Sequence, residues 1–147
     1  MDARKQKILD FLKTQTLGVV STIDANEDKP ESAEVAFSET ENLEVIFGTL
    51  NDARKFLNLK KNNRVAFVIG WDEVTVQYEG AAREITDAKE LKECQERHVA
   101  KNPYSEKYVY DEREVFYKVT PKWIRYTDFS TEPEGGLRWS FSERNLL

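Results

Sequence analysis

The 147-residue chain has 33% charged residues and a net charge of −5, with one cysteine and one histidine. This acidic balance argues against a basic surface for nucleic acid or anionic membranes, and no apolar run is long enough to span a bilayer. Cys94 has no partner for an internal disulfide, and one Cys with one His is too few for a metal centre. The first residues also lack the apolar core of a signal peptide. We therefore expect one cytoplasmic domain over residues 1–147 that binds no metal, membrane or nucleic acid.

The first third of the chain predicts a helix followed by three strands. Residues 2–15 have the spacing of an amphipathic helix that Asp2 can cap, within an N-terminal segment 1–16. Turn-forming residues occupy 24–30 and 40–42. The apolar, β-branched stretches between these turns predict three strands, Leu17–Ile23, Ser32–Ser38 and Leu43–Thr49.

The middle of the chain predicts a short helix from Asn51 or Asp52 and then two strands. Arg64–Trp71 is almost continuously apolar, which is typical of a strand buried on both faces. Glu73–Ile85 instead alternates between apolar and polar residues. Gly80 lies within this second strand and indicates a bulge or a bend at a barrel corner.

The last third predicts one helix, two strands and a tail. A capping-box-like start at Asp87 begins a helix that reaches about Ala100. On this helix, His98 is expected to be a surface residue without a role. Two strands, Glu114–Thr120 and Lys122–Phe129, are joined tightly at Pro121. The tail, 130–147, is expected to be flexible up to residue 136 and then to carry an apolar patch, Leu137–Phe141.

The order of these elements indicates the fold class. Consecutive strands with tight turns favour antiparallel pairing, whereas a parallel sheet needs a helix after almost every strand. Closing the strands into a barrel removes exposed edges. We predict a mainly β (α+β) protein, an antiparallel barrel of about six to seven strands with flanking helices.

The junction between the third strand and the short helix carries the strongest functional pattern. Arg54 and Lys55 fall in the first turn of the helix, where cations oppose the helix dipole. A bound anion would reverse that cost, because free N–H groups, the Thr49 hydroxyl and both cations would converge on it. The alternative is a solvated helix start with two surface cations.

The surrounding residues resemble the pyridoxamine 5'-phosphate oxidase-like flavoproteins, which form a split β-barrel. In that family a strand ends in Thr, and an Arg-Lys or Ser-Lys pair, Leu-x-x-Asn and a core strand follow, as they do between Thr49 and Val68. Similar matches cover roughly residues 5–130, and their segments are Leu17–Ile23, Pro30–Phe37, Val74–Ile85 and Pro121–Tyr126.

The resemblance implies a flavin mononucleotide (FMN) site between the two subunits of a homodimer. By analogy, the phosphate contacts Gly48, Thr49, Arg54 and Lys55. Backbone groups of Glu34, Val35, Ala36 and Phe37 face the flavin ring. A side chain from the strand before Gly80 also reaches the ring, which points to Thr75 or Gln77, and Trp139 lies near the flavin of the neighbouring subunit. No Gly-x-Gly-x-x-Gly loop is present, so FMN is expected rather than FAD.

The segment Arg138–Arg144 lacks the His of the Arg-x-His signature in the true oxidase, so another substrate is expected. Two hypotheses remain open. In one, the protein is an FMN-dependent oxidoreductase of unknown small-molecule substrate, fed by NAD(P)H. In the other, it binds a ligand without turnover, as a carrier or sensor. Relatives also bind deazaflavin or haem, and the position of His98 on a charged helix, away from the phosphate segment, argues against haem.

Overall fold

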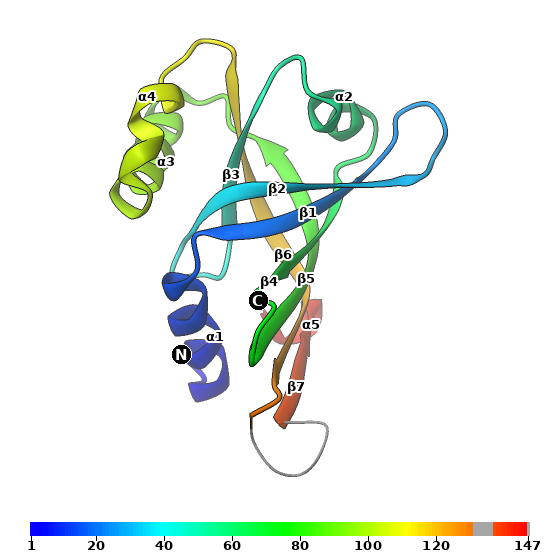
Figure 1. Ribbon diagram of the computed structural model, residues 1–147, viewed down its shortest axis with the longest axis vertical. Coiled ribbons are helices and arrows are strands. Elements are labelled where there is room, and N and C mark those ends of the chain that lie inside the picture. Colours follow the sequence, from blue (N-terminus) through cyan, green and yellow to red (C-terminus); the bar gives the residue numbers. More distant parts are fainter. Residues whose placement is uncertain (131–136, 147) are drawn as a thin grey trace.

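The computed structural model describes residues 1–130 and 137–146 of the chain (Figure 1). A closed antiparallel sheet forms the centre, and the helices surround its ends. The helices are α1 (Ala3–Thr14), α2 (Arg54–Lys61), α3 (Ala88–Lys101), α4 (Glu106–Val109) and α5 (Glu143–Leu146), with a 3-10 turn, η1 (Pro103–Ser105). The strands are β1 (Leu17–Ile23), β2 (Pro30–Glu39), β3 (Val45–Leu50), β4 (Arg64–Ile69), β5 (Val74–Glu84), β6 (Glu114–Asp128) and β7 (Leu137–Ser142).

The strands confirm the predicted split barrel. Neighbours run in the order β3-β2-β1-β4-β5-β6, and pairing of β3 with β6 closes the ring. β7 is an extra strand beside β6. Along one edge of β6, residues 114–119 pair with β3 and residues 123–128 pair with β7.

The barrel opens where β2 and β3 separate. These strands pair over only three positions, from Phe37–Phe47 to Glu39–Val45. Beyond them, β2 continues to pair with β1, while β3 pairs with β6. One backbone edge of residues 30–36 therefore has no strand partner in the described chain. Since backbone polar groups need hydrogen-bond partners, this edge is available to water or a ligand.

The helices lie at two ends of the barrel. In Figure 1, α1 lies beside the lower part, whereas α2 and the α3–α4 pair lie at the upper end on opposite sides of β2 and β3. α1 begins as predicted, with Asp2 accepting a hydrogen bond from the Arg4 N–H. Its buried residues, Ile8, Leu9 and Leu12, join the barrel core. Among the described helices, none is both long and apolar enough to cross a membrane.

Side chains on the inner face of the strands fill the barrel. Phe67 packs edge-on against both Phe47 and Tyr78, with ring centroids 5.7 and 5.9 Å apart. The buried Tyr78 hydroxyl donates to the Leu43 carbonyl oxygen at 2.7 Å. The predicted bulge at Gly80 is confirmed by a shift in the β5–β6 register between Glu79 and Gly80.

Several predicted strand features were wrong. β4 is not buried on both faces, because Val68 is 41% exposed. The two strands expected around Pro121 form one strand, β6, in which Pro121 lies at the register shift opposite Gly80. The apolar patch after the tail is β7, and its Phe141 is buried in the chain's own core. The stretch 131–136, predicted to be flexible, lies outside the described residues.

Candidate functional site

A cavity of about 360 Å³ occupies the opening between β2 and β3. The start of α2 forms one wall, and the α3–α4 segment with the first residue of β6 forms the other (Figure 1). Six of the predicted site residues line it together: Glu34, Val35, Ala36, Gly48, Thr49 and Lys55. The remaining lining residues are Leu50, Ala53, His98, Tyr108 and Glu114.

The start of α2 provides the positive end of this cavity. The helix begins at Arg54, later than the predicted Asn51 or Asp52, and its N-cap residue Ala53 gives no side-chain hydrogen bond. Its first turn has no acidic residue and two cations. The backbone N–H groups at a helix start have no intrahelical partners and carry partial positive charge. This end of α2 therefore favours an anion.

Lys55 is the cation that faces the cavity. Its side chain is half-buried and makes no hydrogen bond or ion pair within the described residues. Burial lowers its pKa, the carboxylate of Glu114 acts in the opposite direction, and neighbouring Arg54 lowers it further. A partly desolvated cation without a partner is costly for the protein alone, and an anionic ligand would remove that cost.

Arg54 is held differently. Its side chain is 71% exposed, and its guanidinium donates to Glu31 Oε2 at 2.7 Å. The other oxygen of Glu31 accepts from Asn58 at 2.9 Å, and Asn58 also donates to Thr22 at 3.0 Å. These residues border an adjoining cavity of about 210 Å³, which shares Lys55 with the first. Arg54 thus lies at the predicted place but already has a carboxylate partner.

The free edge of β2 forms the floor of the cavity. Glu34 and Ala36 point outward from the barrel, whereas Val35 and Phe37 are 7% and 0% exposed and belong to the core. Phe37 does not line the cavity, because β2 pairs with β3 from that position onward. Only the stretch before Phe37 can offer backbone groups to a ligand.

The wall opposite α2 contains three titratable residues that the sequence did not reveal. His98 was predicted to be a surface residue, but it is 2% exposed and lines the cavity. Its Nδ1 lies 3.2 Å from Ser38 Oγ, and burial lowers its pKa to about 4. Burial also raises the pKa values of Tyr108 and Glu114.

The other predicted site residues lie outside the cavity. The register aligns Glu34, Val19, Val68 and Gln77 in one row across β2, β1, β4 and β5. With neighbouring strands about 4.8 Å apart, Gln77 lies roughly 14 Å from Glu34 on the outer face. Thr75 lies two residues before Gln77 on the same face of β5.

Trp139 lies elsewhere, on β7, where its ring stacks on Tyr126 with centroids 4.5 Å apart. It therefore belongs to the packing of β7 against β6, away from the cavity at α2. A single chain does not bring Thr75, Gln77 or Trp139 to Lys55.

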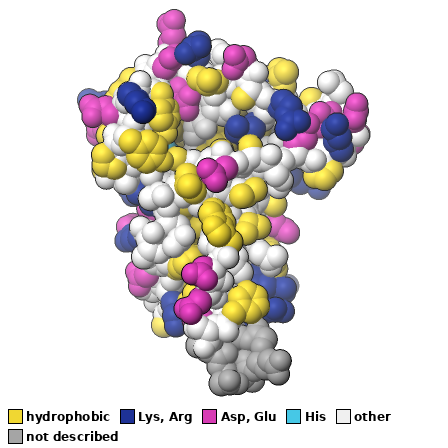
Figure 2. All heavy atoms as spheres, viewed as in Figure 1, with side chains coloured by type: hydrophobic (Ala, Val, Ile, Leu, Met, Phe, Trp, Pro, Cys, Tyr) yellow, Lys and Arg dark blue, Asp and Glu magenta, His cyan; other side chains and the backbone are white. Residues whose placement is uncertain are grey.

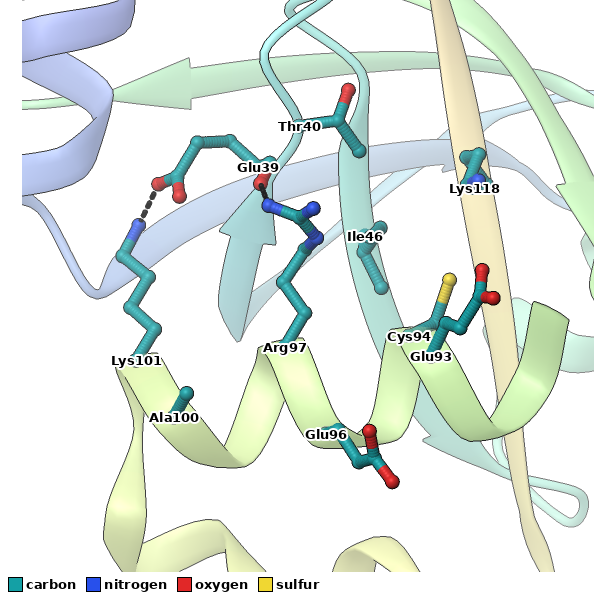
Figure 3. A pocket seen from close by; sticks show the side chains of 10 residues that line it. All are labelled: Glu39, Thr40, Ile46, Glu93, Cys94, Glu96, Arg97, Ala100, Lys101 and Lys118. Carbon is teal, nitrogen blue, oxygen red and sulfur yellow. Dashed lines mark hydrogen bonds and ion pairs between the residues drawn. The ribbon is translucent and has the colours of Figure 1, made fainter. Parts of the chain in front are cut away.

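A larger hollow of about 700 Å³ lies beside α3 (Figure 3). Its charged side chains are largely satisfied within the chain. Lys101 forms an ion pair with Glu39, Arg97 donates to the Glu39 carbonyl oxygen at 3.2 Å, and Lys118 pairs with Glu90 at 3.0 Å. These contacts fasten α3 to the barrel. The smaller cavity at Lys55 is the better candidate site, because its cation has no partner.

Comparison with known protein families agrees with this architecture. A sequence model of the pyridoxamine 5'-phosphate oxidase family matches residues 5–128. The chain belongs to this family. The match includes most of α1, every barrel strand and the whole Lys55 cavity. No curated protein sequence matches the chain.

Solved structures with the family fold include a haem-binding protein from Mycobacterium smegmatis, with a TM-score of 0.80 and 13% identity over 99% of this chain and 60% of that protein. General stress protein 26 from Bacillus anthracis has a TM-score of 0.70 and 23% identity, covering 94% of this chain and 98% of its own. HutZ, the haem storage protein from Vibrio cholerae, has a TM-score of 0.69 and 14% identity, covering 80% of this chain and 89% of its own. These similarities establish the fold alone, and this chain spans about three fifths of the mycobacterial protein.

Proposed function

We propose that the protein binds FMN, with its phosphate at the start of α2 and Lys55 as the main phosphate ligand. The observation that carries this proposal is the half-buried, unpaired ammonium of Lys55 beside an uncapped helix start. Thr49, the residue before the last one of β3, lines the same cavity and adds a hydroxyl. The cavity volume of about 360 Å³ is at the lower end of the range for small-molecule sites, roughly 300–1,000 Å³.

The flavin ring lies along the free edge of β2 in this proposal. Unpaired backbone groups between Glu34 and Ala36 suit the polar edge of an isoalloxazine ring, which both donates and accepts hydrogen bonds. The cavity is open on this side, so one chain covers only part of a bound flavin. A second copy of the chain completes the site.

A two-fold homodimer through the outer face of β1, β4 and β5 supplies that second copy. Hydrophobic side chains lie along the middle of the face in Figure 2, in the region of β4 and β5. Val68 is 41% exposed at the centre of the sheet, and Trp71, two residues after β4, is 60% exposed. Exposed apolar patches of this kind mark interfaces, and two-fold pairing is the commonest arrangement. Gln77 shares this face and would then approach the flavin region.

Bound FMN would supply the redox chemistry of an oxidoreductase that takes electrons from NAD(P)H and reduces a small acceptor. The protein binds, orients and shields the cofactor in this scheme. Anaerobic addition of NAD(P)H to the FMN-loaded protein tests this part. Loss of the oxidised flavin absorbance supports an enzyme, and an unchanged spectrum supports a carrier or sensor.

Purification followed by FMN titration tests the binding proposal. Heat release of the bound ligand and chromatography against standards should identify FMN. Recovery of FAD, or no binding of FMN by the reconstituted protein, would contradict the proposal.

Haem binding is the second candidate function, and the position of His98 favours it. The expectation that His98 lies away from the phosphate segment was wrong, since His98 and Lys55 line one cavity. If Nδ1 of the neutral imidazole donates to Ser38, Nε2 keeps the lone pair that iron requires. Addition of haem should then give a sharp absorption band that is lost in His98→Ala. A band that is equal in both proteins would exclude His98 as the ligand.

A further inference from the structure

Glu114 places a carboxylate without a partner inside the Lys55 cavity. It is the first residue of β6 and pairs with Leu50 at the end of β3. Its side chain is half-buried and makes no hydrogen bond or ion pair with the described residues. The nearby Asp111 is already paired with Arg113 at 2.9 Å. A half-buried carboxylate can accept several hydrogen bonds, and here its capacity is unused.

Gly48 makes room for this carboxylate. A Cβ atom on Gly48 would lie only 2.5 Å from Glu114 Oε1 and 3.1 Å from the Phe116 ring. Because Gly48 has no side chain, the Glu114 carboxylate can lie directly over β3 at Gly48, the residue before Thr49. The half-buried carboxylate therefore lies against the cavity wall.

Lys55 and Glu114 give the cavity one positive and one negative group. They are more than 4 Å apart, so they do not form an ion pair, although each influences the pKa of the other. A ligand that satisfies both must carry an anion at one position and hydrogen-bond donors a short distance along. A phosphorylated polyol has this pattern, because its hydroxyl groups are joined directly to the phosphate-bearing carbon chain.

We propose that Glu114 is a specificity-determining residue that accepts hydrogen bonds from the ribityl hydroxyl groups of the flavin. The inference rests on the proposed function, since it takes the phosphate to lie at Lys55. Hydroxyl groups that donate to a carboxylate form charge-assisted hydrogen bonds, which are about twice as strong as neutral ones.

Three flavins separate the parts of the ligand. Lumiflavin has the ring alone, riboflavin adds the ribityl chain, and FMN adds the phosphate. Fluorescence titration of each flavin against wild type and Glu114→Ala should show riboflavin and FMN weakened by a similar factor, roughly tenfold to a hundredfold, with lumiflavin unchanged. Lys55→Ala should weaken FMN alone. Glu112→Ala, which removes an exposed carboxylate two residues away, is the matched control and should leave all three affinities unchanged.

The outcomes that overturn the inference differ from those that overturn the proposed function. If wild type binds FMN and Glu114→Ala binds riboflavin and FMN as tightly as wild type, Glu114 does not contact the ribityl chain. Tighter FMN binding without a change for riboflavin would mean that Glu114 only repels the phosphate. Glu114→Gln keeps the shape and an acceptor oxygen, so it should lose less affinity than the alanine variant, and it covers the case in which the alanine variant fails to fold. If wild type binds none of the flavins, the proposed function itself fails.

Discussion

Replacing Lys55 with alanine should weaken FMN binding much more than replacing Arg54. The half-buried Lys55 ammonium has no partner among the described residues, so it can give a phosphate its full charge-assisted hydrogen bond. Losing such a bond costs roughly 1.5–3 kcal/mol, or about tenfold to a hundredfold in Kd. Arg54 is 71% exposed and holds Glu31, so its contribution to phosphate binding resembles that of a surface ion pair, about 0–1 kcal/mol.

Fluorescence titration with FMN at fixed ionic strength measures this difference, and thermal unfolding without ligand separates binding from folding. The ligand-free Lys55→Ala protein should be at least as stable as wild type. The substitution removes a partly desolvated cation from a helix start, where such a charge costs up to about 1 kcal/mol. Lys60→Ala, on the exposed side of α2, is the matched control and should change neither quantity strongly.

Two results would refute the reasoning. One is a Lys55→Ala protein that binds FMN with wild-type affinity. The other is an Arg54→Ala protein that loses more affinity than Lys55→Ala, because the phosphate would then displace Glu31 and use Arg54 as its main ligand.

Three further predictions concern stability and assembly. Burial lowers the pKa of His98 in the folded protein to about 4, so below pH 6.5 the unfolded chain binds more protons than the folded one. The free energy of unfolding in urea titrations should therefore fall as the pH is lowered from 6.5 to 5, and His98→Gln should flatten this fall. Gly80→Ala should cost about 1–3 kcal/mol in the same assay, because the new Cβ would overlap the Thr120 carbonyl oxygen, and an unaltered midpoint would show that the bulge adapts. Val68→Lys should convert a wild-type dimer to a monomer in light scattering, whereas a wild type that is monomeric at micromolar concentration contradicts the proposed interface.

Local sequence signals predicted most of the fold, because they act over a few residues. Asp2 and Asp87 cap the helices as expected, and the β5–β6 register shifts at Gly80. The strand predictions failed where pairing with a residue far away in the sequence decides whether a strand continues. Pro121 lies inside a continuous β6 at the register shift opposite Gly80, a position in a strand where proline is tolerated, and neither residue alone reveals that pairing.

The site was predictable on one side only. Lys55 and Thr49 belong to one short segment whose pattern of strand, turn and cations is visible in the sequence. His98 was missed because charged residues surround it on α3. Its burial depends on long-range contacts, which include the ion pair of Lys101 with Glu39 and the hydrogen bond from Asn102 to the Phe37 carbonyl oxygen at 3.0 Å.

The separation of β2 from β3 produces both halves of the candidate site. If β3 continued to pair with β2 beyond Phe47, the β2 edge would be hydrogen-bonded and no cavity would exist. Through its other edge β3 pairs with β6 along its whole length, which brings Glu114 over Gly48. On the other side, α2 is fixed to the β1–β2 hairpin through Asn58, which is 3% exposed and binds Thr22, the Glu31 carboxylate and the Ala25 N–H. The unpaired backbone, the cation and the carboxylate therefore meet where β2 and β3 separate, with α2 held in the opening.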